Sequence, residues 1–235
     1  IGTRAKAHRR RPGWVNLWPM FNRLLIANRG EVAVRIARAC RALGVSPIGV
    51  ASESDADSAW AQSMDRLVVL GPSAPGKSYL QMERVVQAAR QELCSAIHPG
   101  WGFLAENAGF AALCRQHGIT FVGPSPELMA KMGLKSPAKA AMRAAGLPVI
   151  PGSDGPLDNL AQAVEVARET GYPVILKADA GGGGRGMRIV HKSSELSNAI
   201  KLARAEASSA FGSGELILEK AIMRPRHVEI QVFGD

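Results

Sequence analysis

The sequence predicts an α/β protein with two units: a parallel, doubly wound sheet of the Rossmann type, followed by a smaller α+β unit. Two patterns predict this fold. In the first half, short continuous apolar runs alternate with helical segments, and in the second half a hairpin is mixed with helices. The length of 235 residues suits one large domain or two small ones. Every apolar run is shorter than the roughly 18 residues that cross a bilayer, so we expect no membrane association.

The first unit is expected over residues 21–131. Its apolar runs show no polar alternation, which indicates strands buried on both faces of a parallel sheet. These runs lie at residues 24–27, 48–51, 67–70, 96–98 and 119–122. Helical periodicity begins after Gly30 and meets a stop signal at Gly44, and it returns near residues 79–92 and 106–117. This order of elements is typical of a doubly wound sheet.

The second unit is expected over residues 132–235. The chain breaks at Gly123-Pro124-Ser125-Pro126, after which Ser136 is expected to cap a helix that has Pro137 at its first position. A Gly- and Pro-rich crossing at residues 148–156 follows. The remaining elements are helices at 157–169 and from Glu195, and strands at 174–178, 187–190 and 216–219.

Polar side chains alternate at the end of the sequence. A last strand would place His227, Glu229 and Gln231 on one face, because side chains of a strand alternate between its two faces. A polar face on an apolar strand suggests a cleft. A half-exposed sheet would show the same alternation, so the pattern alone leaves both interpretations open.

Charge and cysteine content restrict the function. The formal net charge is +9. Five of the 29 basic residues lie in the first 19 positions, where no acidic residue occurs, so the remaining chain carries 24 basic against 20 acidic residues. That excess suits an anionic small ligand, and we expect no nucleic-acid partner. Cys40, Cys94 and Cys114 are widely spaced and form no C-x-x-C pair, which favours a reducing compartment such as the cytoplasm.

The basic N-terminal segment stands apart from both units. Residues 1–20 show no hydrophobic periodicity and are expected to be a disordered extension. A secretory signal would need an apolar stretch after the basic residues, and none is present. A mitochondrial presequence, and with it the mitochondrial matrix, remains an alternative because the segment is rich in arginine and lacks acidic residues.

One candidate phosphate loop is rejected on physical grounds. Residues 71–78 match G-x-x-x-x-G-K-S and lie between an expected strand and an expected helix. A P-loop binds phosphate through successive backbone N–H groups, and Pro72 and Pro75 each lack that donor. We therefore interpret residues 71–78 as a connection between a strand and a helix.

A second glycine-rich loop is the stronger candidate. Residues 181–184 are four consecutive glycines between two expected strands. Each glycine costs about 0.5 to 1 kcal/mol of backbone entropy relative to alanine, so a purely structural hairpin is expected to use fewer of them. A flap whose amides fold over phosphates has a reason to use them, and Lys177 and Arg185 would add cations. The alternative is a flexible linker with a solvated lysine.

Four separated motifs resemble biotin carboxylase. They are Leu25-Ile26-Ala27-Asn28-Arg29-Gly30-Glu31, the segment His98 to Asn107, Lys177 with its glycine loop, and Arg226-His227-Val228-Glu229-Ile230-Gln231. The match runs from about Phe21 to Asp235. It is similar to the biotin carboxylase subunit of acetyl-CoA carboxylase, an enzyme of fatty acid biosynthesis, and to the equivalent region of propionyl-CoA, methylcrotonyl-CoA and pyruvate carboxylases.

The resemblance implies a Rossmann-like domain followed by an ATP-grasp domain, of which this chain would hold the N-terminal part. It implies a ligase that uses ATP and Mg²⁺ to phosphorylate bicarbonate to carboxyphosphate and then carboxylates biotin on a biotin carboxyl carrier protein. A carboxyltransferase would be a further partner, and the complete protein is expected to be a homodimer. The choice of acyl or keto acid acceptor belongs to that transferase.

Site residues follow from the same resemblance. Lys135 and Lys177 would contact ATP phosphates, Gly183 and Gly184 would supply loop amides, and His227 would be a further nucleotide contact. The adenine edge would be held by Glu219, Lys220, Ala221 and Ile222. No catalytic residue is expected within this chain, and the magnesium ligands are expected downstream of Asp235.

Some residues depart from the family pattern. Leu134 replaces an acidic residue, Ala180 replaces a loop glycine, and Trp101 and Ala105 replace Tyr and Ser. None of these changes removes a cation or a donor. Because the sequence stops before the expected magnesium, bicarbonate and biotin residues, we expect a fragment that binds nucleotide weakly without turnover. The alternatives are another ATP-grasp carboxylate ligase and a non-catalytic scaffold.

Overall fold

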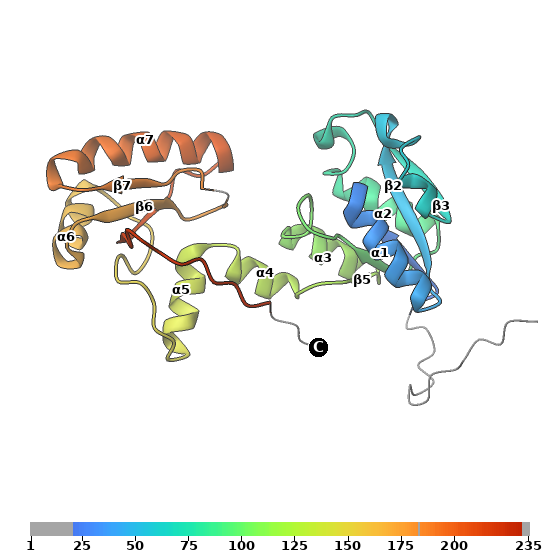
Figure 1. The fold of residues 1–235 in the computed structure, drawn as a ribbon, viewed down its shortest axis with the longest axis horizontal. Helices are drawn as coiled ribbons and strands as arrows, with labels where there is room; N and C mark the ends of the chain where they lie inside the picture. Colours follow the sequence, from blue (N-terminus) through green and yellow to red (C-terminus); the bar gives the residue numbers. More distant parts are fainter. Residues whose placement is uncertain (1–20, 183, 232–235) are drawn as a thin grey trace, which may run out of the picture. The chain divides into compact units, whose positions relative to one another are not determined.

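The computed structural model describes residues 21–182 and 184–231, in two compact units that divide between Pro126 and Glu127 (Figure 1). The expected boundary after residue 131 lies near the end of helix α4 (Pro126–Met132). The expected disordered extension, residues 1–20, lies outside the described residues.

The first unit contains a five-stranded sheet in the order β3-β2-β1-β4-β5, and all its strand pairs are parallel. The strands are β1 (Arg23–Ile26), β2 (Ser46–Ser52), β3 (Arg66–Gly71), β4 (Ala96–His98) and β5 (Thr120–Phe121). The helices are α1 (Gly30–Ala42), α2 (Met82–Gln91) and α3 (Ala108–Gln116), with 3₁₀ turns at Glu53–Asp55, Ala61–Ser63 and Pro75–Lys77. The predicted Rossmann-type sheet is confirmed.

Strand β1 shows why the apolar runs are continuous. Leu24 and Ile26 pack with Ile36 of α1 in one core cluster, whereas Leu25 packs with Phe110 of α3 in the other. Helices therefore cover both faces of the sheet, and neither side of β1 can carry polar residues. Gly44 ends the α1 turn with φ of 73°, as its role as a stop signal predicts.

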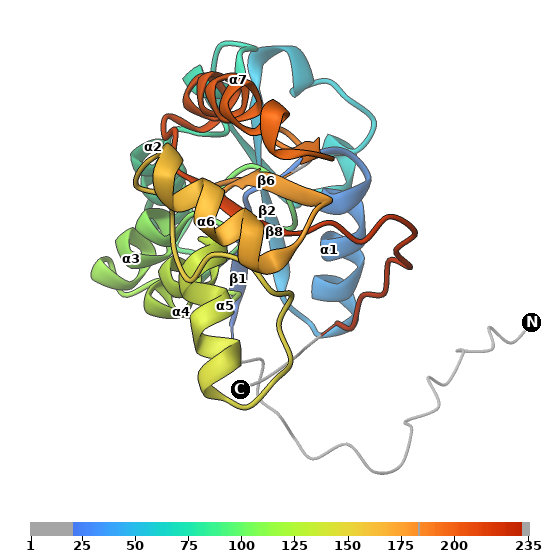
Figure 2. The same cartoon turned by 90° about the vertical axis from the view of Figure 1, so that its left-hand side faces the viewer.

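The second unit contains a three-stranded antiparallel sheet in the order β7-β6-β8. Its strands are β6 (Val174–Ala178), β7 (Arg188–Val190) and β8 (Leu216–Lys220), and its further helices are α5 (Lys135–Ala144), α6 (Leu160–Thr170) and α7 (Ser193–Phe211). The core combines Leu176 and Leu218 of the sheet with Ala163 of α6 and Leu196 of α7. Figure 2 shows α6 and α7 beside these strands. The predicted α+β character is confirmed.

Two helix starts differ from the predictions. The expected cap Ser136 lies inside α5, which begins at Lys135 after Leu134, because the side chain of Ser136 is used to bind Asp179. Helix α6 begins at Leu160, three residues later than expected, because the Asn159 side chain accepts a hydrogen bond from the N–H of Gln162.

The predicted strand through His227, Glu229 and Gln231 is wrong. Residues 221–231 form no regular element, and the side chains over 222–231 are exposed. Alternation sets which face a side chain occupies, but a strand also needs a hydrogen-bonded neighbour. The predicted connection at residues 71–78 is confirmed: it leads from β3 through the 3₁₀ turn Pro75–Lys77 toward α2. None of the described helices is long and apolar enough to cross a membrane.

Candidate functional site

The sheet of the second unit has one face that α6 and α7 cover and one that they leave open. Val174, Leu176 and Ala178 of β6 belong to the core on the covered face. Ile175 and Lys177 alternate with them and point to the other face. The strand register pairs Ile175 with Glu219 of β8. Lys177 follows Ile175 by two positions on the same face, so Lys177 and Glu219 are diagonal neighbours across the two strands.

Glu219 is a buried carboxylate between two lysines. Its Oε2 lies 2.8 Å from Nζ of Lys177, and its Oε1 lies 3.1 Å from Nζ of Lys139 on α5. The side chains of Glu219 and Lys139 are 9% and 7% exposed, and that of Lys177 is 23% exposed. Burial by itself raises the pKa of the Glu219 carboxyl, but the hydrogen bonds and charges of the two lysines outweigh it and hold the pKa below its usual value.

Lys135 reaches the same place from the start of α5. Its Nζ donates to the carbonyl oxygen of Gly181 at 2.6 Å and to that of Asp179 at 3.4 Å. Burial lowers the pKa of Lys135, the carboxylate of Asp179 opposes this, and the charge of Lys177 lowers the pKa further. The two predicted phosphate lysines, 42 positions apart in the sequence, therefore lie within electrostatic range of each other at the base of the glycine loop.

The glycine loop joins the antiparallel strands β6 and β7, as the predicted hairpin requires. Gly181, Gly184 and Gly186 have φ of 75°, 78° and 67°, values that favour glycine. A Cβ at Gly181 would also collide with the ring of Phe211. Gly183, one of the two glycines predicted to supply amides, lies outside the described residues.

The segment predicted to hold the adenine edge is divided in its roles. The Lys220 ammonium donates to the carbonyl oxygens of Gly171 and Tyr172, at 2.8 and 3.0 Å, beyond the end of α6. Ala221 is buried and its N–H donates to the carbonyl of Pro173, whereas the Ile222 side chain is exposed. The side chain of Lys220 is thus engaged in the fold.

His227 stands apart from the lysines. Its Nε2 lies 2.8 Å from Oε1 of Glu229, and the two side chains are 81% and 82% exposed. Within the described part of the chain, the structure brings Lys135, Lys177 and Glu219 together but does not bring His227 to them. Among the described residues, no group of three or more His, Cys, Asp or Glu side chains is arranged to hold a metal ion.

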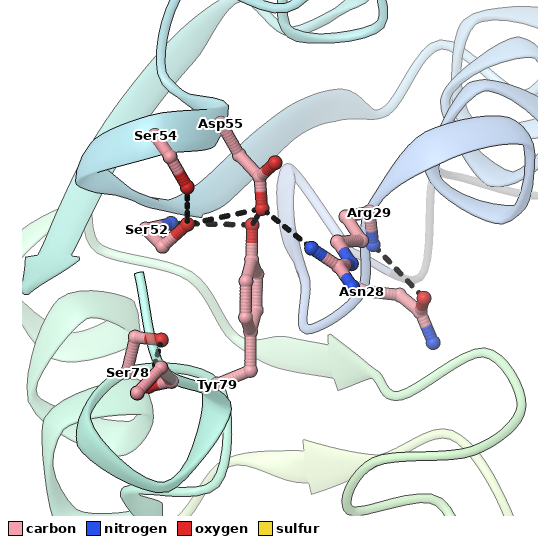
Figure 3. A network of polar contacts seen from close by, with 8 residues as sticks. Asn28, Arg29, Ser52, Ser54, Asp55, Ser78 and Tyr79 are labelled. Carbon is pink, nitrogen blue, oxygen red and sulfur yellow. Dashed lines mark hydrogen bonds and ion pairs between the residues drawn. The ribbon is translucent and has the colours of Figure 1, made fainter. Parts of the chain in front are cut away.

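A second polar cluster lies at the carboxyl ends of β1 and β2 in the first unit (Figure 3). Asp55 accepts hydrogen bonds from Arg29 at 2.9 Å, Tyr79 at 2.7 Å and Ser52 at 3.0 Å. The Arg29 guanidinium lies 5.5 Å from the ring centroid of Tyr79 and 5.6 Å from that of Phe103. These groups satisfy one another, so the cluster holds the loops after β1, β2, β3 and β4 in place.

Known proteins match both units. The family described as "Biotin carboxylase, N-terminal domain" matches residues 20–129, and "Carbamoyl-phosphate synthase L chain, ATP binding domain" matches residues 135–235. The protein named biotin carboxylase 1 of Bacillus subtilis is 50% identical over 216 residues, which are 92% of this chain and 48% of that protein. The chain therefore contains a biotin carboxylase N-terminal domain and an ATP-binding domain, and it is similar to curated biotin carboxylases over 92% of its length. It spans about half the length of the curated relatives it matches.

Solved biotin carboxylase structures share the fold. A biotin carboxylase–beta-gamma-ATP complex from Campylobacter jejuni has a TM-score of 0.86 and 46% identity, over 88% of this chain and 47% of that one. The biotin carboxylase domain dimer of Hydrogenobacter thermophilus 2-oxoglutarate carboxylase, with MgADP, ADP and bicarbonate, has a TM-score of 0.84 and 46% identity, over 87% and 45% of the two chains. The predicted ATP-grasp family of the second unit is confirmed.

Two residues of this candidate site were missed from the sequence. Asp179 is 1% exposed and accepts two hydrogen bonds from Ser136. Lys139 is the buried partner of Glu219. A signal for Lys139 was present, because it follows Lys135 by four positions and residues at that spacing share one face of a helix. Asp179 directly precedes the glycine run, which is the weaker signal.

Proposed function

We propose that this chain supplies the nucleotide-binding part of an ATP-dependent biotin carboxylase. Its support is that Lys135, which donates to the carbonyl of Gly181 in the glycine loop, lies near enough to Lys177 for their charges to interact, while Lys177 pairs with Glu219 on the β6–β8 sheet. ATP would lie on the open face of that sheet, with its phosphates between the two ammonium groups and the loop amides of Gly183 and Gly184.

The proposed chemistry suits this geometry. Phosphoryl transfer depends on positioning and on neutralising charge more than on covalent help from the protein. Ammonium groups on two rigid elements, α5 and β6, keep their places before the nucleotide arrives, and such preorganised charge is the effective kind. A loop of glycines between two strands can bring backbone N–H groups close to phosphate oxygens, because no side chains block the approach.

The adenine would lie toward Glu219, Lys220, Ala221 and Ile222. Because the side chains of Glu219 and Lys220 are engaged with lysines and with carbonyls, their contribution to the base would come from the backbone. The apolar side chain of Ile175, on the open face, would contact the flat surface of the ring. His227 would join the nucleotide only after the segment 222–231 moves from its exposed position.

The remaining partners belong to the same proposal. MgATP would phosphorylate bicarbonate to carboxyphosphate. Biotin on a carrier protein would then accept the carboxyl group, and a carboxyltransferase would transfer that group to the final acceptor. We further propose a homodimer as the complete assembly. Acetyl-CoA carboxylase, and with it fatty acid biosynthesis, is the proposed setting, in a reducing compartment such as the cytoplasm, where three free and buried cysteines stay reduced.

Binding of ATP provides the first test. We expect Lys177→Ala to abolish binding of MgATP, measured by calorimetry, because the phosphates lose an ammonium held at the base of the loop. Lys201→Ala, which removes an exposed lysine of α7, is the matched control and should leave binding unchanged. Unchanged affinity in Lys177→Ala would favour a non-catalytic scaffold.

The identity of the reaction needs a second test. On the complete protein, ADP release from MgATP should require bicarbonate and should be stimulated by free biotin. Nucleotide binding without stimulation by biotin would leave the nucleotide site in place and remove the substrate assignment, in favour of another ATP-grasp carboxylate ligase.

A further inference from the structure

Lys139 is a buried cation that the proposed nucleotide contacts do not use. It lies one turn after Lys135 on α5, and its side chain is 7% exposed. Lysine is almost never buried without a partner, because an ammonium loses its hydration there. The partners of Lys139 are Oε1 of Glu219 at 3.1 Å and the carbonyl oxygen of Ser153 at 3.5 Å. The fold therefore places this lysine specifically against Glu219.

Glu219 divides its two oxygens between two lysines. Lys139 holds Oε1, and Lys177 lies on Oε2 at 2.8 Å. Without Lys139, the full charge of a buried carboxylate would be left to Lys177. A phosphate that approaches Lys177 would then compete with a carboxylate that has no other cation, in surroundings where such attraction is strong.

The net charge around Glu219 also indicates that Lys139 favours the binding of phosphate. Lys135, Lys139 and Lys177 contribute three ammonium groups, and Glu219 and Asp179 contribute two carboxylates, so one net positive charge remains. Removal of Lys139 would leave a neutral cluster. An anionic triphosphate gains from the positive sum and gains nothing comparable from a neutral one.

We propose that Lys139 is a positioning residue of the nucleotide site, which neutralises Glu219 and so leaves Lys177 available to the phosphates of ATP. This inference rests on the proposed ATP-binding function. Ligand affinities distinguish this role from a purely structural one. Loss of a purely structural lysine would weaken the binding of every ligand of the site alike. A neutralising lysine affects the phosphates and leaves the base almost untouched.

The test compares the affinities of the full chain for MgATP and for adenosine, which carries no phosphate. In Lys139→Met we expect MgATP to bind about tenfold or more weakly, equivalent to about 1.4 kcal/mol. Adenosine should change by less than about twofold, which is under half of that free energy. Lys139→Arg should keep the affinity of the unmodified protein. Arg143 lies on the same helix as Lys139, is exposed, and pairs with Asp154. Arg143→Met should therefore leave the affinities for MgATP and adenosine unchanged.

A double variant keeps the test decisive if Lys139→Met does not fold, since breaking a buried ion pair is strongly destabilising. Lys139→Met with Glu219→Gln removes one charge of each sign, so its preference for MgATP over adenosine should equal that of the unmodified protein. Equal losses for both ligands in Lys139→Met, or a lost preference in the double variant, would overturn the inference. If the unmodified protein binds no MgATP, the proposed function fails and the inference fails with it; if it binds MgATP and Lys139→Met binds it as tightly, only the inference fails.

Discussion

Asp179 accepts two hydrogen bonds from Ser136, one from its backbone N–H at 2.7 Å and one from its hydroxyl at 2.8 Å. The carbonyl of Asp179 also accepts from the N–H of Lys135 at 3.1 Å. The end of β6 thereby satisfies two of the N–H groups that the first turn of α5 leaves unpaired. One residue thus fixes the start of the helix that carries Lys135 to the strand that carries Lys177.

This link predicts the effect of Ser136→Ala. The substitution removes the hydroxyl donor from a buried carboxylate, so we expect a loss of about 1 to 3 kcal/mol in the free energy of unfolding, measured by urea denaturation. The binding of MgATP should weaken as well, because Lys135 loses part of its support. Ser194→Ala, at an exposed position in the first turn of α7, is the control. A stability equal to that of the unmodified protein would show that the bond from the Ser136 hydroxyl to Asp179 does not help to hold α5.

Gly181 and Gly182 should respond differently to alanine. Gly181 has φ of 75° and faces the ring of Phe211, so Gly181→Ala combines backbone strain of about 1 to 2 kcal/mol with a collision. Gly182 has no atom within 4 Å of an added Cβ, so Gly182→Ala should leave the melting temperature nearly unchanged. Thermal unfolding of the two variants measures the difference. Equal destabilisation by both would contradict the described conformation of the loop.

Lys77 should be dispensable for nucleotide binding, although it occupies the lysine position of a P-loop pattern. The hydroxyl of Ser78 donates to the carbonyl of Ala74 at 3.1 Å, and the Arg84 guanidinium donates to the carbonyl of Lys77 at 3.2 Å. The segment therefore uses its own groups to stabilise a turn. We expect Lys77→Ala to bind MgATP with the affinity of the unmodified protein in calorimetry; a marked loss would restore the P-loop interpretation.

Tyr79 should make stability depend on pH in the alkaline range. Burial raises its pKa to about 12, and the adjacent Asp55 carboxylate adds to the rise. In the unfolded chain a tyrosine loses its proton near its ordinary pKa of about 10. The contribution of the protonated hydroxyl is therefore complete below pH of about 10 and is lost as the pH rises toward about 12.

Comparison with Tyr79→Phe isolates this effect from the titration of lysines. The variant should be about 1 to 3 kcal/mol less stable at pH 8, because Asp55 and Ser52 lose a partner. The difference between the two proteins should shrink between pH 10 and the pKa of about 12. Urea denaturation at several pH values measures it, and a difference that stays constant with pH would contradict the raised pKa.

Most of the fold could be predicted because its signals are local. The continuous apolar runs of the first unit follow from burial on both faces, as Leu24 and Leu25 show by packing into opposite clusters. The glycine run between two strands, with Lys177 before it, predicts the hairpin in the same way. Both patterns can be recognised from residues that are close together in the sequence.

The site could be predicted only in part, because its pairs join distant positions. Ser136 and Asp179 are 43 positions apart, and Ser136 reads as a helix cap until the strand that holds Asp179 is placed beside it. Lys139 reads as a solvated lysine until β8 brings Glu219 against α5. The prediction of a strand at 227–231 was wrong for a related reason, since alternation carries no information about the neighbouring strand that a sheet requires.

The adjacent residues Glu219 and Lys220 have different roles: Glu219 pairs with Lys139 and Lys177, whereas Lys220 binds backbone carbonyls. Its ammonium donates to the carbonyl oxygens of Gly171 and Tyr172 at the end of α6, so these hydrogen bonds engage it within the fold and compete with contact to an anion. The side chain of Lys220 thus stabilises the end of α6, and under the proposed function the base would be recognised by backbone groups of residues 219–222. Under that proposal, a change of base preference would require a different course of the backbone, whereas substitution of Lys220 would mainly destabilise the fold.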